Sequence, residues 1–216
     1  TVFLYTRMLI TMIVSFYSSR IVLEQLGISD YGVYGLVGGI VAMFGFFNSS
    51  MASATQRYLT IDIGQGNLVQ LEKTFSATLT IHIGLAFAVT LLAETIGLWY
   101  VNTIMIFPKE RIFAVNVVYQ FSVATAFLGI IQVPYNALII AKEKMNIYAY
   151  VSVLEAVLKM LIVFLLLLFG YDKLITYSVL IFLVTSVVRL IFKIYCRTNF
   201  KEVKYKFEYD KNTFKE

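Results

Sequence analysis

Six charged residues lie inside long apolar segments of the sequence: Arg7, Arg20, Glu94, Glu155, Lys159 and Arg189. A charge at the centre of a bilayer costs about 2.5–3.5 kcal/mol on insertion scales, so such residues usually face a protein interior or a watery cavity. Arginine is permanently charged, and its forked donors match phosphate geometry. The pattern favours a polar cavity for a charged substrate, with snorkelling of the side chains toward the helix ends as the alternative.

The spacing of these charges adds detail. Glu155 and Lys159 stand four residues apart, in the order that suits an ion pair on one helix face. They fit either a structural ion pair or a pair that faces substrate or relays protons. Arg7 and Arg20 are thirteen residues apart, which places them on related but not identical helix faces. They could line one cavity at different depths.

Composition identifies the environment of these charges. The chain has 216 residues, of which 59% are hydrophobic and 14% charged, and its mean hydropathy is +0.79. Soluble domains have roughly 45–50% apolar and about 25% charged residues, so a soluble, disordered or disulfide-rich protein is excluded. One cysteine and one histidine offer no internal disulfide and no histidine-rich metal site. With no P-loop, HExxH or GxSxG motif, we expect neither a cofactor nor an enzyme.

Six apolar runs are each long enough to cross a bilayer as a helix. They cover about 3–23, 31–53, 76–101, 112–140, 147–170 and 174–195. Strict alternation is absent, which excludes a membrane β-barrel. We predict an all-α, polytopic bundle of six transmembrane helices over residues 1–196, with the longest connection at about 57–74.

Basic residues set the predicted orientation through the positive-inside rule. One set of connections holds two Lys or Arg at 57–74, two at 141–146 and seven toward the C-terminus, whereas the opposite set holds four. Residues 197–216 are therefore predicted to be a basic cytoplasmic tail, with the N-terminus also cytoplasmic. The net charge of +5 thus reports topology, and no soluble basic domain is present that would bind nucleic acid.

Glycine and proline mark two candidate hinges. Gly35 and Gly39 have the GxxxG spacing that permits close helix packing, and a flexible point in a moving helix is the alternative. Pro134 lies late in the fourth apolar run, where it removes a backbone hydrogen bond and should kink the helix. That kink could be structural or could line a cavity with freed carbonyl groups.

Four stretches carry a family resemblance: SRIVLEQLGISDYGVY at 19–34, MASATQRY at 51–58, ETIGLW at 94–99 and VPYNA at 133–137. Together they resemble bacterial polysaccharide and O-antigen flippases of the multidrug/oligosaccharidyl-lipid/polysaccharide exporter superfamily. The resemblance implies two six-helix lobes around a central cavity and export of an undecaprenyl-diphosphate-linked oligosaccharide across the inner membrane by alternating access. It also implies Arg20, then Arg7, as diphosphate contacts, and Arg57 at the cytoplasmic mouth.

The length departs from that family, whose members are about twice as long or more. The chain therefore resembles the N-terminal lobe, with 197–216 as the linker to a second lobe, and two paired copies are the alternative. Expected partners are the lipid-linked oligosaccharide, the bilayer, the second lobe and polysaccharide assembly proteins, and the coupling ion stays open. Alternative functions are a cation-coupled multidrug exporter, a membrane glycosyltransferase or polymerase subunit, and a purely structural assembly subunit.

Overall fold

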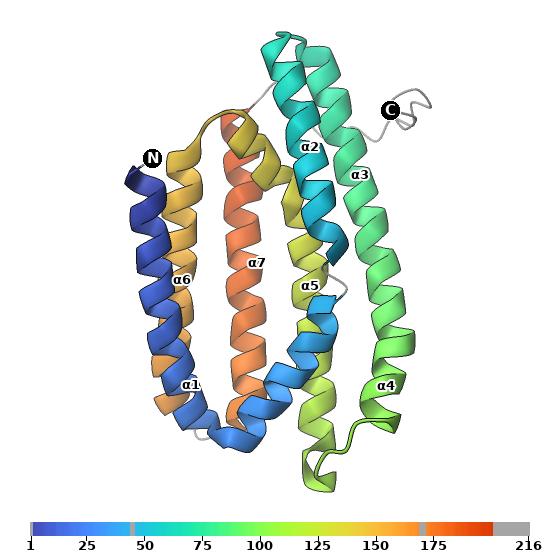
Figure 1. The fold of residues 1–216 in the computed structure, drawn as a ribbon, viewed down its shortest axis with the longest axis vertical. Coiled ribbons are helices and arrows are strands. Elements are labelled where there is room, and N and C mark those ends of the chain that lie inside the picture. The colour runs from blue at the N-terminus through green and yellow to red at the C-terminus, as the bar shows by residue number, and fades with distance from the viewer. Residues whose placement is uncertain (1, 44–45, 169–171, 201–216) are drawn as a thin grey trace.

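The computed structural model describes residues 2–43, 46–168 and 172–200, with side chains except at 2–4 and 46–50. The helices are α1 Val2–Met43, α2 Phe46–Gly64, α3 Leu68–Leu92, α4 Leu98–Thr103, α5 Ile112–Ala141, α6 Met145–Leu168 and α7 Lys173–Asn199. A π-helical turn, Ala93–Gly97, joins α3 to α4, and a short 3-10 turn, Lys109–Arg111, precedes α5. Most helices run side by side, as expected when each must satisfy its own backbone hydrogen bonds in lipid (Figure 1).

Helix α1 reverses direction at Gly27, so it consists of two arms, 2–26 and 28–43 (Figure 1). Gly27 has φ 76° and ψ 167°, a conformation that is essentially restricted to glycine. The first arm lies beside α6, and the second returns across the bundle toward α2. A single glycine therefore replaces the connection expected between the first two predicted helices.

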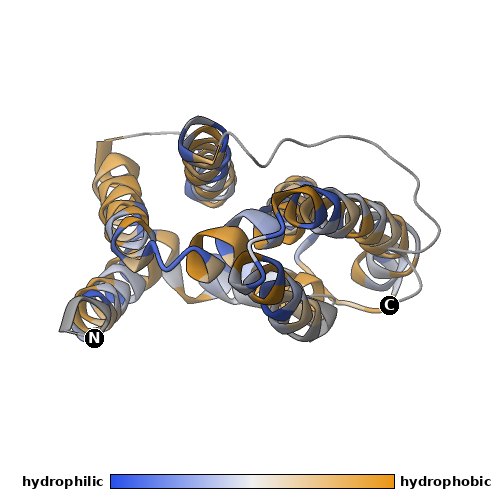
Figure 2. Cartoon of the chain, turned by 90° about the horizontal axis from the view of Figure 1, so that it is seen from above, coloured by the Kyte–Doolittle hydropathy of each residue, from blue (hydrophilic) through white to orange (hydrophobic). Residues whose placement is uncertain are grey.

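Five helical segments of the described residues are long and apolar enough to cross a membrane: Tyr5–Met43, Leu68–Thr103, Lys109–Ala141, Met145–Leu168 and Lys173–Asn199. Because α1 reverses at Gly27, the first of these segments consists of two arms, and the second arm continues toward α2. Many large hydrophobic side chains stay exposed, and Figure 2 shows apolar residues along the helices throughout the bundle. The chain is an all-α, polytopic membrane protein, as the composition predicts.

The predicted helix boundaries need one correction. The predicted second helix, 31–53, falls on the second arm of α1 and the start of α2, and its residues 44–45 lie outside the described residues. The long connection predicted at 57–74 is wrong, because α2 continues to Gly64 and α3 already begins at Leu68. Polar helical turns that extend beyond the apolar core carry no hydropathy signal. By contrast, α5 matches the predicted helix 112–140 within one residue. Of the predicted tail 197–216, residues 201–216 lie outside the described residues.

Helix α5 forms the centre of the bundle, since it packs against α1, α2, α3, α6 and α7 and contributes to both hydrophobic clusters. One cluster joins α5 to α3 and α7, with Phe75, Leu138, Ile139 and Val188 among its buried members. The other joins the start of α5 to the second arm of α1, with Val37, Val115 and Val118 fully or almost fully buried. A cavity lies at the edge of the second cluster, where α1 meets α6 and α7.

Candidate functional site

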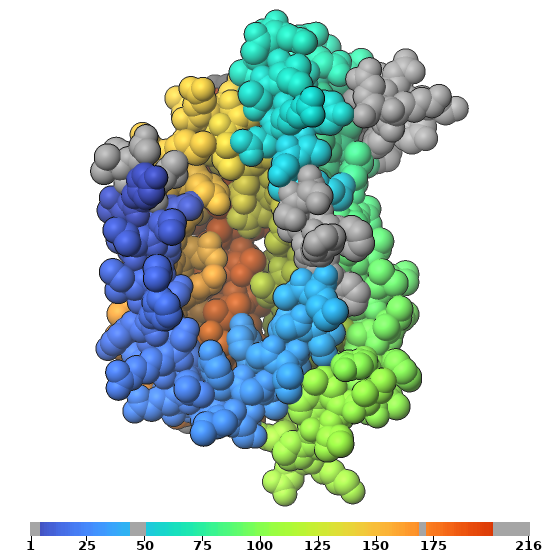
Figure 3. All heavy atoms as spheres, viewed as in Figure 1, coloured from blue at the N-terminus to red at the C-terminus, as the bar shows by residue number. Residues whose placement is uncertain are grey.

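The two arms of α1 form the rim of a hollow whose floor is made by α6 and α7 (Figure 3). A cavity of about 260 Å³ lies here. The first arm contributes small serines, the second arm Tyr31 and Tyr34, α6 contributes Lys159, and α7 contributes Tyr177. Hydroxyl groups and one ammonium group therefore line a cavity between apolar helices. We call this cavity the Lys159 cavity.

Lys159, which lines this cavity, forms the predicted ion pair with Glu155. The Lys159 Nζ atom lies 2.6 Å from Oε1 of Glu155. Both side chains remain partly exposed, at 44% for Lys159 and 33% for Glu155, so the pair is open to a ligand. On the first arm, the buried hydroxyl of Ser18 has no hydrogen-bond partner. An unpaired hydroxyl beside an ammonium group suits an incoming oxygen-rich, anionic ligand.

Arg7 lies on the same seam between α1 and α6. Its Nη1 atom donates to the Ser152 hydroxyl at 3.4 Å, and its guanidinium carbon lies 4.7 Å from the centre of the Tyr148 ring. Tyr148, Ser152, Glu155 and Lys159 follow at helical spacing, so they share one face of α6. The Nε atom of Arg7 is buried without a partner. The α1–α6 seam thus carries two cations and one carboxylate.

Arg20 and Arg57 are not brought to this seam. Arg20 is exposed, and it lies about 200° around the helix from Ser18 and from the buried Val22, which face the cavity. Arg57 is exposed on α2, beside an open depression of about 560 Å³ lined by residues of that helix alone. The roles predicted for Arg20 and Arg57 stay predictions.

Glu94 lies apart from the Lys159 cavity, in the π-helical turn Ala93–Gly97. Its Oε2 atom accepts a hydrogen bond of 3.0 Å from Gln120 of α5. The turn is held by Tyr119, whose buried hydroxyl donates to the Ala93 carbonyl at 2.6 Å. A Cβ atom at Gly97 would come within 2.2 Å of the Tyr119 hydroxyl, so glycine is required for this contact. Glu94 therefore marks a specific contact between α3, α4 and α5.

The candidate hinges occupy different environments. Gly35 and Gly39 are exposed, and a Cβ atom at either would meet nothing within 4 Å, so neither mediates close helix packing among the described residues. Pro134 is buried within α5, and Figure 1 shows α5 leaning over in its last turns. Near this proline, the Asn136 Oδ1 atom is buried without a partner. The predicted kink is present, and its role as a hinge stays a prediction.

Arg111 makes a contact that was not anticipated from the sequence. Its Nη2 and Nε atoms both bind the Asp30 carboxylate, Nε at 3.0 Å, and its Nη1 atom lies 2.5 Å from Asp172 Oδ2. Asp172 also caps α7 by accepting from the backbone of Leu174 and Ile175. We call Arg111, Asp30 and Asp172 the charge clamp. The sequence did contain a signal for this cluster, because all three residues lie in connections that the orientation prediction assigns to the same side of the membrane.

Tyrosines of the Lys159 cavity were also missed. The rings of Tyr34 and Tyr177 meet edge to face with centroids 4.9 Å apart, which joins the second arm of α1 to α7. Tyr31 precedes Tyr34 by three residues and lines the same cavity. Tyrosines are common in membrane helices, so their spacing alone could not separate a cavity wall from an interfacial belt.

Comparison with known proteins adds no identity: no family model matches the chain, and no curated protein or solved structure matches it significantly. Within the described part of the chain, no group of three His, Cys, Asp or Glu side chains could hold a metal ion. The chemistry available at the site is that of Lys159, Glu155, Arg7 and the surrounding hydroxyl groups.

Proposed function

We propose that the protein exports a lipid-linked oligosaccharide across a bacterial inner membrane by alternating access. In this proposal the carrier is undecaprenyl diphosphate, and its diphosphate enters the Lys159 cavity. The observation that carries the proposal is the α1–α6 seam, where Lys159 lines a cavity together with serine and tyrosine hydroxyl groups and Arg7 adds a second cation further along the seam. The resemblance of four sequence stretches to polysaccharide flippases supports the same substrate class.

The balance of charge favours an anionic substrate over a cationic one. A cation exporter needs carboxylates that dominate its cavity, whereas the charged residue among those that line this cavity is Lys159, and Glu155 is paired with it. Glu94, the other carboxylate singled out from the sequence, binds Gln120 on α5 and lies outside this cavity. Serine and tyrosine hydroxyls suit the oxygen atoms of phosphate and sugar groups. These features support a phosphate-linked glycan as the substrate.

The second arm of α1 is the element that we expect to move. It carries four glycines, Gly32, Gly35, Gly38 and Gly39, and each lowers helix stability by about 1 kcal/mol relative to alanine. It begins at the Gly27 reversal and forms one side of the Lys159 cavity. Swinging of this arm would change access to the cavity while the α3–α5–α7 cluster stays packed. A second lobe would complete the transport path, and both termini of this chain would be cytoplasmic.

The test is glycan export in cells that lack the chromosomal copy and carry a variant of the protein. We expect Lys159→Met to abolish most export, because it removes the ammonium group from the cavity. Lys144→Met is the matched control, since Lys144 is exposed in the turn between α5 and α6. Each variant must first be shown to reach the membrane in equal amount.

A double variant separates binding from a structural ion pair. If Lys159 only neutralises Glu155, then Lys159→Met with Glu155→Gln should restore export, because no unpaired charge remains. If Lys159 binds the phosphate, the double variant should stay inactive. Restored export would overturn the site assignment. Export of a fluorescent cation with normal surface glycan would instead overturn the proposed substrate.

A further inference from the structure

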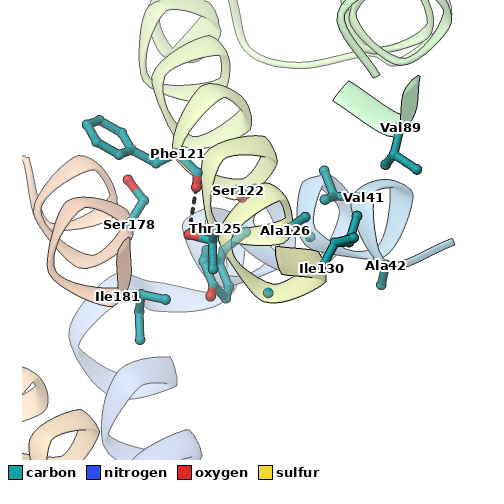
Figure 4. Close-up of a pocket in the computed structure, with 13 residues that line it drawn as sticks. Val41, Ala42, Val89, Phe121, Ser122, Thr125, Ala126, Ile130, Ser178 and Ile181 are labelled. Carbon is teal, nitrogen blue, oxygen red and sulfur yellow. Dashed lines mark hydrogen bonds between the residues drawn. The ribbon is translucent and has the colours of Figure 1, made fainter. Parts of the chain in front are cut away.

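A second cavity of about 300 Å³ lies further along the second arm of α1, on the helix face that also lines the Lys159 cavity (Figure 4). Its walls come from that arm, α5 and α7, with Val89 of α3 at one edge. Figure 4 shows Val41, Ala126, Ile130 and Ile181 around the space. None of its described lining residues is charged, and we call it the neutral cavity.

The serine and threonine hydroxyl groups at the neutral cavity donate their hydrogen bonds to carbonyl groups of their own helices. Ser122 donates to the Val118 carbonyl at 2.8 Å, and Ser178 donates to the Ile175 carbonyl at 2.8 Å. Thr125 donates to the Phe121 carbonyl at 2.7 Å, which is the dashed line in Figure 4. A buried water needs two to four polar partners, whereas an apolar cavity stays dry and binds hydrocarbon. The neutral cavity therefore suits an apolar group better than water or phosphate.

The two cavities are neighbours that share a wall. Tyr34 lines both of them. Its edge-to-face contact with Tyr177 joins the second arm of α1 to α7 at the boundary between the cavities. Tyr177 faces the Lys159 cavity, and the next residue, Ser178, faces the neutral cavity. A charged compartment and an apolar compartment are thus separated by one pair of tyrosine rings.

We propose that the neutral cavity binds the hydrocarbon segment next to the anionic head of a lipid whose head lies in the Lys159 cavity. This inference rests on the proposed function for the placement of the head. The volume of the neutral cavity is about twice the ~150 Å³ of a cavity that admits benzene, so it has room for a short length of chain. The tyrosine pair would contact the junction between head and chain.

The bilayer interior is as apolar as the cavity wall, so a hydrocarbon chain alone gains little by leaving the lipid. A phosphate without a chain would reach the Lys159 cavity but leave the neutral cavity empty, with its wall atoms lacking contacts. An amphiphile satisfies both compartments at once. The pair of cavities therefore selects molecules that join an anionic head to an apolar chain.

The experiment uses the protein in phosphatidylcholine nanodiscs and a decyl phosphate that carries a photoreactive diazirine at the end of its chain. After illumination, cross-linked peptides are identified by mass spectrometry. We expect labels on α5 within 122–130 and on α7 near Ile181, and we expect excess unlabelled decyl phosphate to remove them. Labels confined to lipid-facing surfaces such as Phe164 or Leu161 of α6 would overturn the inference.

Filling the cavity supplies the matched control. Ala126→Phe places a ring in the neutral cavity, whereas Ala88→Phe makes the same change at an exposed position next to Val89. Cavity labels should disappear in Ala126→Phe and persist in Ala88→Phe. Gly129→Leu is a second filling variant, because a Cβ atom there meets nothing within 4 Å. Persistence of the cavity labels in both folded filling variants would overturn the inference.

Two further measurements test whether binding depends on the anionic head, and whether this inference and the proposed function can fail independently. The diazirine analogue of decanol should label the neutral cavity far less than the phosphate, and equal labelling would overturn the link to an anionic head. Lys159→Met should reduce labelling by the phosphate probe. Labelling that depends on Lys159 while Lys159→Met leaves glycan export intact would support the inference and reject the proposed function. If Lys159→Met abolishes export but the probe never labels the neutral cavity, the proposed function would be supported and this inference rejected.

Discussion

The two ends of the bundle use their charges differently. At the end that holds Gly27, Arg111 binds two carboxylates, Asp30 and Asp172, from two other chain segments. At the opposite end, two of the described cations lie over aromatic rings: Arg7 over Tyr148 at 4.7 Å, and Lys142, which also has other contacts, over Phe200 at 5.7 Å. The first arrangement ties helices together by forked, charge-assisted hydrogen bonds, which are stronger than exposed cation–π contacts.

This difference indicates which end opens more easily. Separating the second arm of α1 from α5 and α7 at the clamped end would break several charge-assisted hydrogen bonds. Separating α1 from α6 at the opposite end costs a cation–π contact and the bond from Arg7 to Ser152, which is long at 3.4 Å. We therefore expect this lobe, as described, to be closed at the Gly27 end and looser where the positive-inside rule predicts the cytoplasm.

Removal of the clamp should have the largest effect on stability. Arg111→Met leaves Asp30 and Asp172 without their shared cation, and Asp30 is 10% exposed. We expect a loss of about 2–3 kcal/mol, below the cost of breaking a fully buried pair because Arg111 is one-third exposed. Thermal unfolding in nanodiscs measures it, with Lys109→Met as the control in the same turn. Equal melting temperatures for the two variants would contradict a clamp.

The reversal at Gly27 should come next. Gly27→Ala forces a Cβ atom onto φ 76°, ψ 167°, which costs about 1–3 kcal/mol. Gly35→Ala is the matched control on the same helix, where φ is helical and nothing surrounds the new methyl group, so it should stabilise by about 0.5–1 kcal/mol. Thermal unfolding in nanodiscs measures both changes in stability. A stabilised Gly35→Ala protein that loses export would identify Gly35 as a functional hinge.

The smallest effect on stability is expected at the looser end. Arg7→Met removes the contact with Tyr148 and should cost about 0.5–1 kcal/mol. Arg20→Met, on the exposed side of the same arm, should leave the melting temperature unchanged. A glycan export assay distinguishes Arg7 from Arg20 further, because export should fall only in the variant that removes a contact with the phosphate. Loss of export in Arg20→Met alone would move the phosphate path to the outer face of α1.

The sequence predicted the pairing of Glu155 with Lys159, because four residues on one helix fix their separation before any other helix is present. The limits of α5 were equally accessible, since they coincide with its apolar run. The polar end of α2 was misassigned as part of a loop because hydropathy detects burial in lipid, and a helix can continue into water. The partners of Glu94 and Arg7 could not be predicted, since each lies on a different helix.

Apolar runs and the placement of Lys and Arg determined that the chain crosses a membrane repeatedly as helices, because lipid excludes unsatisfied backbone and charge. Only the tertiary structure decided where those helices meet. It turned Gly27 into a reversal, gathered Arg111, Asp30 and Asp172 into a clamp, and placed Tyr34 between two cavities of opposite character. These features depend on contacts between helices far apart in the chain, which helical periodicity alone does not encode.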